Sequence, residues 1–248
     1  MLFDKVKMEF FGTFAIVYFT GLVYVQNRIE VLSLLETGVG TFLIYSFMLW
    51  AGRSISGSQY NPIVTLAMML TNHIKLLNGC VYMLFQLIAS IFAVCLVRIT
   101  IPTEVASVLQ DDTLLGFPIL ADVNPFRKML VEFIGSFFFV FAYYSLLIEK
   151  NAPKYIYGAG IAAISFVFTL FSFAKSGGGL NPARQLSYSF VSGNYHDLYV
   201  FFIGPILGGI LGGLLGNYLL SEKSEISKQK KKEEKKARQS IDLKKREV

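Results

Sequence analysis

The sequence predicts an all-α membrane protein with six transmembrane helices and two shorter re-entrant half-helices, arranged as an inverted repeat. Three observations lead to this prediction. Charged residues make up only 16% of the 248-residue chain, whereas a typical globular domain carries about 25%. Six apolar stretches are long enough to cross a bilayer. Two shorter apolar segments each begin with Asn-Pro, and their surroundings are alike.

Charge is unevenly distributed along the chain. Residues 221–248 hold 11 of the 23 Lys and Arg residues and 6 of the 17 Asp and Glu residues. The preceding residues therefore have too few polar groups to cover a water-facing surface, which excludes a secreted disulfide scaffold, a disordered protein and an ordinary cytosolic enzyme. We expect a membrane domain over residues 1–220 and a basic, disordered tail over residues 221–248. The tail either binds anionic lipid or a regulator or is simply solvated.

The apolar stretches differ in length, and length decides which of them can span a membrane. A helix needs roughly 20 apolar residues to cross the hydrocarbon core. Two segments, at about residues 61–71 and 181–191, are too short to span and would each run about 16 Å as helices. Placed end to end, they would cross a core of about 30 Å. The long stretches lie at about residues 8–26, 34–52, 79–99, 129–149, 156–174 and 198–220.

The two short segments carry helix-start signals. Asn61 precedes Pro62, and Asn181 precedes Pro182. Proline is favourable at the first position of a helix because its missing N–H would be unbonded there. Asparagine is a good N-cap because its side chain accepts from the first free N–H groups. Each Asn-Pro pair therefore predicts the start of a half-helix.

The two halves of the membrane domain form an internal repeat, over about residues 8–99 and 129–220. The segment MEFFGTF corresponds to VEFIGSF, which pairs Glu9 with Glu132 at an offset of 123 residues. The segment ISGSQYNP, ending at Pro62, corresponds to KSGGGLNP, ending at Pro182, at an offset of 120 residues. Matches in the same order at nearly constant spacing indicate duplication.

A third match pairs the surroundings of Gln86 with those of Pro205, at an offset of 119 residues. Each copy contains three spans, so the second copy enters the membrane upside down. Inverted repeats bring their interrupted helices together near the midplane. Non-helical backbone at that depth must be buried in protein or line a wet cavity. We therefore expect the loops over residues 53–60 and 175–180 to line a cavity.

Four features together resemble the major intrinsic protein family, which comprises aquaporins and aquaglyceroporins. They are NPIVT at residues 61–65, NPAR at residues 181–184, the duplicated EF-x-G-(S/T)-F motif, and Gln86 together with GPILGG at residues 204–209. The resemblance covers about residues 8–218 and implies the aquaporin-like fold, with residues 1–220 as the channel domain. Two Asn-Pro boxes at this spacing are far more specific than one.

The resemblance implies a passive transmembrane channel for water that excludes ions and protons, with small neutral solutes such as glycerol as further candidates. It also implies a homotetramer in membrane lipid with one pore per subunit. The sequence has no nucleophile–base pair, metal cluster or phosphate loop, so we expect no enzyme activity, cofactor, metal site or nucleic-acid partner. Two other functions stay open. One is a facilitator whose main solute is glycerol, urea or ammonia, and the other is a non-conducting membrane junction protein.

The resemblance also assigns a central constriction. Facing helix N-termini carry partial positive charge and repel cations and protons. Neutral asparagine amides would hold one water at mid-pore. Ile63 stands where the family usually has alanine, and its bulk is expected to shift the half-helix or narrow the pore centre. The expected members are Asn61, Pro62, Ile63, Asn181, Pro182 and Ala183.

Arg184 follows Asn181 in the second Asn-Pro box, and an arginine at membrane depth is costly and functional by default. The resemblance implies that Arg184 lines the narrow outer constriction, the selectivity filter. By resemblance its companions are Thr41, Thr169 and Gly178. Water-selective family members usually have an aromatic residue and a histidine at two of these sites, so these small residues favour a wider constriction. Gln185 favours water, because glycerol-conducting members usually have aspartate there.

Glu9 and Glu132 are acids inside apolar helices. By resemblance they support the re-entrant loops together with Gln86, accepting hydrogen bonds from loop N–H groups that need buried partners. A proton path, as in a proton-coupled transporter, is the alternative interpretation.

A four-residue spacing marks Gly204, Gly208, Gly212 and Gly216 in the last apolar stretch. Such a stripe of small residues lets helices approach closely, either within one bundle or across a dimer interface.

The basic residues of short loops set the orientation of a membrane protein. In a six-span arrangement most of them lie on one side, so both termini are expected in the cytoplasm, with the protein in the plasma membrane or an internal membrane. The residues on that side, besides those of the tail, are Lys5, Lys7, Arg53, Lys75, Lys150 and Lys154.

Overall fold

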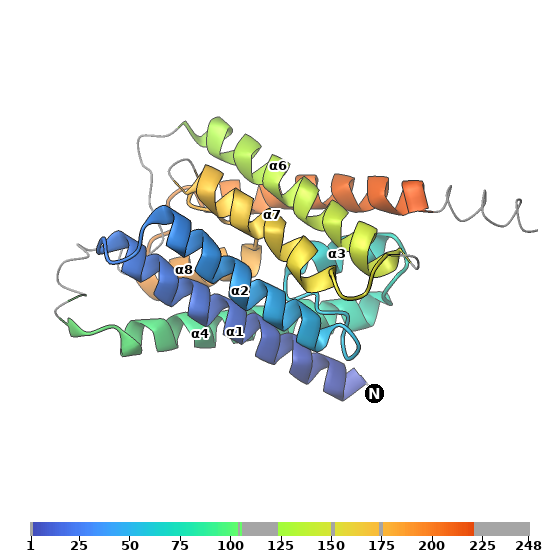
Figure 1. Cartoon of the computed structure of the whole chain (residues 1–248), viewed down its shortest axis with the longest axis horizontal. Coiled ribbons are helices and arrows are strands. Elements are labelled where there is room, and N and C mark those ends of the chain that lie inside the picture. The colour runs from blue at the N-terminus through green and yellow to red at the C-terminus, as the bar shows by residue number, and fades with distance from the viewer. Residues whose placement is uncertain (1, 104, 106–123, 150–151, 174–175, 221–248) are drawn as a thin grey trace, which may run out of the picture.

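The computed structural model describes residues 2–103, 105, 124–149, 152–173 and 176–220. Over these residues the protein is a bundle of long helices around two short ones (Figure 1). The basic tail over residues 221–248 lies outside the described residues.

Six long helices occupy the six predicted spans. Five of them are long and apolar enough to cross a membrane. The sixth, α7, has 16 residues, or about 24 Å, and is shorter than the predicted stretch 156–174. The long helices are α1 (Leu2–Arg28), α2 (Leu34–Gly52), α4 (Leu76–Thr100), α6 (Pro125–Tyr143) with its π-helical continuation η2 (Tyr144–Ile148), α7 (Tyr157–Ser172) and an unlabelled helix, Val200–Leu220.

The two half-helices begin at their prolines, as predicted. They are α3 (Pro62–Leu70) and α8 (Pro182–Ser192). Asn61 caps α3 through a 3.1 Å bond from the Ile63 N–H to its side-chain oxygen. Asn181 caps α8 in the same way, accepting from the Ala183 N–H at 3.0 Å.

The helices pack in pairs that reflect the repeat. α1 packs against α4, and α8 also lies against α4. The second spans of the two halves, α2 and α7, pack directly against each other (Figure 1). Such a contact between equivalent helices is expected where two inverted copies meet. The half-helix α3 lies against α4, α6 and α8, so both short helices are enclosed by long ones.

The glycine stripe of the last helix, Val200–Leu220, packs against α6 of the same chain. A Cβ atom at Gly208 would lie 2.1 Å from the Phe133 carbonyl oxygen, and one at Gly212 would lie 2.2 Å from the Phe137 carbonyl oxygen. Gly204 approaches the α6 backbone one turn earlier. These glycines therefore serve close packing within the bundle, the first of the two interpretations of the stripe.

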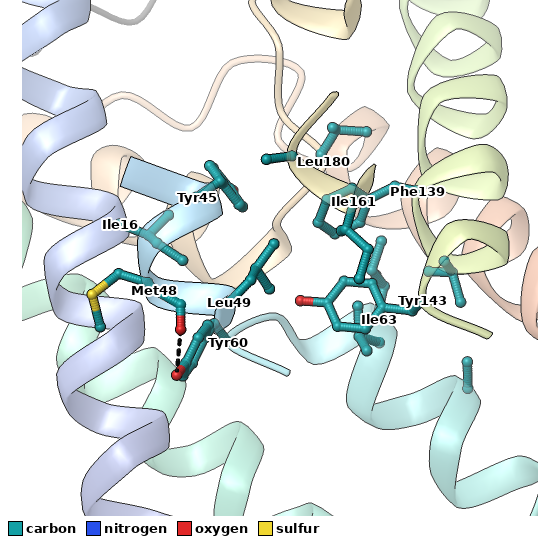
Figure 2. Close-up of a cluster of buried hydrophobic side chains, with 14 of the residues drawn as sticks. Ile16, Tyr45, Met48, Leu49, Tyr60, Ile63, Phe139, Tyr143, Ile161 and Leu180 are labelled. Carbon is teal, nitrogen blue, oxygen red and sulfur yellow. Dashed lines mark hydrogen bonds between the residues drawn. The ribbon is translucent and has the colours of Figure 1, made fainter. Parts of the chain in front are cut away.

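An apolar core surrounds both polar loops. Tyr60 and Leu180, which directly precede the two capping asparagines, belong to one buried cluster. Figure 2 shows them with Tyr143 and Ile63, and with the hydrogen bond that the Tyr60 hydroxyl donates to the Met48 carbonyl oxygen. The residues that precede both capping asparagines are therefore held within apolar packing.

The glycine packing can be tested with Gly208→Ala. The added methyl group would overlap backbone that cannot turn aside, so we expect a loss of about 1–3 kcal/mol of unfolding free energy. Thermal unfolding of the purified protein in detergent measures this loss. Leu207→Ala is the control, because Leu207 is 52% exposed on the same helix. Equal stability of the two variants would contradict the packing described.

Candidate functional site

The two re-entrant loops adopt the same unusual backbone. Tyr60 and Leu180 have φ angles of 50° and 51°, and Ser58 and Gly178 have φ angles of 52° and 76°. Non-glycine residues rarely occupy this left-handed region and do so only where the surroundings hold them. Each pair is separated by 120 positions, so the repeat found in the sequence extends to the backbone conformation.

Each capping asparagine reaches across to the opposite loop. The Asn61 side-chain amide donates to the Leu180 carbonyl oxygen at 2.8 Å. The Asn181 side-chain amide donates to the Tyr60 carbonyl oxygen at 3.1 Å. Both asparagines are 2% exposed. The reciprocal bonds bring the N-termini of α3 and α8 together, so both helix dipoles point their positive ends at one place.

Glu9 on α1 binds the first loop with both carboxylate oxygens. Oε1 accepts from the Ser56 hydroxyl at 2.6 Å and from the Gln59 N–H at 2.9 Å. Oε2 accepts from the Tyr60 N–H at 2.6 Å and from the Gln86 side-chain amide at 2.8 Å. These donors match a carboxylate that only accepts. They are the contacts that a loop-supporting role requires.

Glu132 on α6 binds the second loop in the same manner. Oε1 accepts from the Ser176 hydroxyl at 2.6 Å and from the Gly179 N–H at 2.9 Å. Oε2 accepts from the Leu180 N–H at 2.8 Å. The equivalent acids of the two repeats therefore bind equivalent atoms of the two loops.

Two tyrosines that the sequence did not single out also hold the first loop. The Tyr143 hydroxyl donates to the Ser58 carbonyl oxygen at 2.7 Å. The Tyr157 hydroxyl donates to the Gly57 carbonyl oxygen at 3.2 Å. Both tyrosines come from the second half of the chain and are fully buried. Their only signal in the sequence is a polar group within an apolar span.

Arg184 is buried at the start of α8, 2% exposed. Its guanidinium donates to the carbonyl oxygens of Gly178 and Gly179. It also lies over the ring of Tyr24, with Cζ 5.5 Å from the ring centroid. The Tyr24 hydroxyl lies 3.4 Å from the Thr169 hydroxyl. The structure thus brings three of the four predicted filter residues, Thr169, Gly178 and Arg184, close to Tyr24. The sequence analysis did not select Tyr24.

Thr41, the fourth predicted filter residue, lies on α2 and is 2% exposed. Its hydroxyl donates back to the Thr37 carbonyl oxygen at 3.0 Å. Tyr45, one turn further along α2, is buried in the same apolar cluster as Tyr60 and Leu180. Thr41 therefore lies one helical turn from the cluster that encloses the two loops.

Ile63 is accommodated by a glycine on a neighbouring helix. Its side chain is 1% exposed. A Cβ atom at Gly209 would lie 3.2 Å from the Ile63 Cβ. With Ile63 in place, α3 keeps both its Asn61 cap and the cross-loop bond to Leu180. The start of α3 therefore keeps the same contacts as the start of α8, and the narrowing of the pore centre by Ile63 stays a prediction.

His73 lies in the turn after α3, outside the spans. Its ring nitrogen lies 3.0 Å from the Thr71 hydroxyl, and its ring meets Tyr144 edge-on at 5.6 Å. Partial burial lowers the pKa of His73, and a hydrogen bond with the Thr71 backbone opposes that shift. The lowered pKa disfavours a charged ring at this end of α3.

Comparison with known proteins identifies the family. The model of the major intrinsic protein family matches residues 2–216. Aquaporin C of Dictyostelium discoideum is 30% identical, over 87% of this chain and 79% of its own length. Aquaporin-1 of Bos taurus is 28% identical over 68% of this chain. The X-ray structure of the aquaglyceroporin from Plasmodium falciparum matches with a TM-score of 0.76, covering 91% of this chain and all of that one at 15% identity.

The chain belongs to the major intrinsic protein family. It is an integral, multi-pass, all-helical membrane protein with the aquaporin fold. Its function is that of an aquaporin-family channel for water or small neutral solutes, not that of an enzyme. Within the ranges described above, no group of three or more His, Cys, Asp or Glu side chains is placed to hold a metal ion.

The loop contacts of Glu9 can be tested with Glu9→Gln. The new amide would point hydrogens at one pair of donors, leaving buried N–H or O–H groups unpaired at a cost of about 1–3 kcal/mol. Thermal unfolding in detergent should show this loss. Glu36→Gln is the control, because Glu36 is an exposed capping-box residue and glutamine serves in that motif. A Glu9→Gln variant as stable as Glu36→Gln would contradict the role assigned to these contacts.

Proposed function

We propose that water passes in single file between the two loops and is held at the centre by Asn61 and Asn181. The supporting observation is the reciprocal pair of bonds from each asparagine to the opposite loop. These bonds fix both amide groups at the point where the two helix N-termini meet. The proposal includes Pro62, Ile63, Pro182 and Ala183 as the remaining lining of the central constriction.

Amide chemistry explains how such a centre would pass water and stop protons. An asparagine amide carries two hydrogens, and the cross-loop bond uses one. The second hydrogen on Asn61 and on Asn181 is left to donate to a water oxygen. That water then points its own hydrogens outward, which interrupts a continuous proton wire. The positive ends of α3 and α8 add a barrier to cations.

The loop carbonyl groups provide the acceptors on either side. A carbonyl oxygen has two lone pairs, so the Tyr60 and Leu180 oxygens can bind an asparagine and still accept from water. Apolar neighbours such as Ile63 keep the water from binding too tightly. This combination favours rapid passage.

Water is the principal solute in this proposal. The outer filter consists of Arg184, Thr41, Thr169 and Gly178. A facilitator whose main solute is glycerol is the second candidate, because the side chains of Thr41 and Thr169 are small. Stopped-flow light scattering on proteoliposomes measures water and glycerol permeability of the same sample. We expect water permeability well above that of empty liposomes, with much slower glycerol entry. Comparable permeabilities would favour the facilitator, and swelling no faster than in empty liposomes would favour a junction protein.

The filter assignment is tested by Arg184→Val. Loss of the buried guanidinium removes the positive charge from the outer constriction, so proton and cation exclusion should weaken while the protein still folds. Proton leak into proteoliposomes loaded with a pH-sensitive dye measures this effect, with water permeability as the control for folding. Unchanged exclusion would mean that Arg184 does not line the pore.

A proton-coupled transporter remains the alternative role for Glu9 and Glu132. The proposal favours a supporting role, because four donors occupy the Glu9 carboxylate. Solute flux should be the same with and without an imposed pH gradient. Flux that follows the gradient would contradict the supporting role.

We also infer that both termini face the cytoplasm. In support, two basic residues assigned to that side meet, since the Arg53 guanidinium donates to the Lys154 carbonyl oxygen at 2.8 Å. Lys150 and the tail lie outside the described residues. Protease digestion of intact cells should leave an epitope on the tail intact, whereas its removal would reverse the orientation.

The homotetramer is a further part of the proposal and rests on the family resemblance. Native mass spectrometry from detergent should give a mass four times that of the 27.8 kDa chain. A monomer under conditions that preserve lipid binding would contradict this assembly.

A further inference from the structure

We propose that Tyr24, on α1, sets the width of the outer constriction and supplies the aromatic wall that Thr41 and Thr169 do not. This inference rests on the proposed filter around Arg184. It assigns a specificity-determining role to a residue outside the positions that the family resemblance selected.

Tyr24 contacts the filter on three sides. Its hydroxyl lies 3.4 Å from the Thr169 hydroxyl on α7. Its ring lies under the Arg184 guanidinium, 5.5 Å from Cζ to the ring centroid. A Cβ atom at Gly178 would lie 3.3 Å from the Tyr24 hydroxyl oxygen. The tyrosine therefore occupies the space that Thr169 and Gly178, with their small side chains, leave open.

The ring is held in place from behind. Phe173, just after α7, meets it edge-on with centroids 5.5 Å apart and an interplanar angle of 87°. Tyr24 is 1% exposed, and an aromatic pair in this geometry adds stabilisation beyond buried area. A side chain held by both an aromatic neighbour and a guanidinium group forms a rigid wall. Rigidity is required for a residue that discriminates between solutes by size.

Tyr24 also bears on the position of Arg184. A cation over an aromatic face is attracted by the ring quadrupole, and the same guanidinium donates to the Gly179 carbonyl oxygen at 2.8 Å. The ring and the loop carbonyl together fix the direction of the positive group. Removing the ring would leave a wider opening beside the hydroxyl of Thr169, which suits a polyol.

The expected selectivity follows from this geometry. Without the ring, the permeability to glycerol should rise far more than the permeability to water, because water already fits through the constriction. A pocket that changes by a few methylene groups typically alters discrimination by about tenfold or more. Tyr24→Ala should therefore raise the glycerol-to-water permeability ratio by about tenfold or more. Tyr24→Phe, which keeps the ring, should leave the ratio within about twofold of wild type.

The experiment uses full-length protein in proteoliposomes and stopped-flow measurement of both permeabilities. Tyr18→Ala is the matched control. Tyr18 is a tyrosine on the same helix, and its hydroxyl approaches Thr100 on α4 at 3.5 Å. The Tyr18→Ala variant should leave the glycerol-to-water permeability ratio unchanged. A Tyr24→Ala ratio equal to that of wild type, in protein that conducts water, would overturn the inference and leave the proposed pore intact.

The remaining outcomes are also decisive. If Tyr24→Ala does not assemble, Tyr24→Leu takes its place, since it also removes the ring and should also raise the ratio. An unchanged Tyr24→Leu ratio would overturn the inference. A ratio that rises equally in Tyr24→Phe would overturn the assignment of the width to the aromatic ring. Wild-type protein that conducts no water would instead contradict the proposed function.

Discussion

The structure depends on two hydrogen bonds that cross between the halves of the chain. Asn61 donates to the Leu180 carbonyl oxygen and Asn181 donates to the Tyr60 carbonyl oxygen. Each asparagine also caps its own half-helix. Each asparagine thus lies at the end of a loop, caps the helix that follows and binds the loop of the opposite repeat. The two short helices meet where these three roles fall on the same residue in both copies.

Polar backbone in the middle of a membrane protein must find partners within the protein or in a wet cavity. The carboxylates of Glu9 and Glu132 provide acceptors for the loop N–H groups. The hydroxyl of Tyr143 provides a donor for a loop carbonyl group. The groups that hold the backbone come from long helices and lie behind the loops. In the proposed mechanism these contacts preorganise the remaining amide and carbonyl groups to bind water.

The sequence predicted the helices and both caps well, because those signals are local and occur twice. Helix starts at Pro62 and Pro182 needed only the Asn-Pro pairs and the length of each apolar segment. The sequence did not reveal the contacts of Tyr24 or Tyr143, because a tyrosine in an apolar span looks the same whether it fills space or binds a loop. Tyr24 and Thr169 are 145 residues apart, and only the fold shows that they meet. The π-helical end of α6 likewise has no signal in local composition.

The most direct test of the central claim is an experimental density map of the protein in lipid that resolves ordered water. The account predicts a continuous lumen with a water oxygen about 3 Å from the side-chain amide nitrogens of both Asn61 and Asn181. Loops that lie apart near the membrane surfaces, or a centre filled by protein with no lumen, would contradict it.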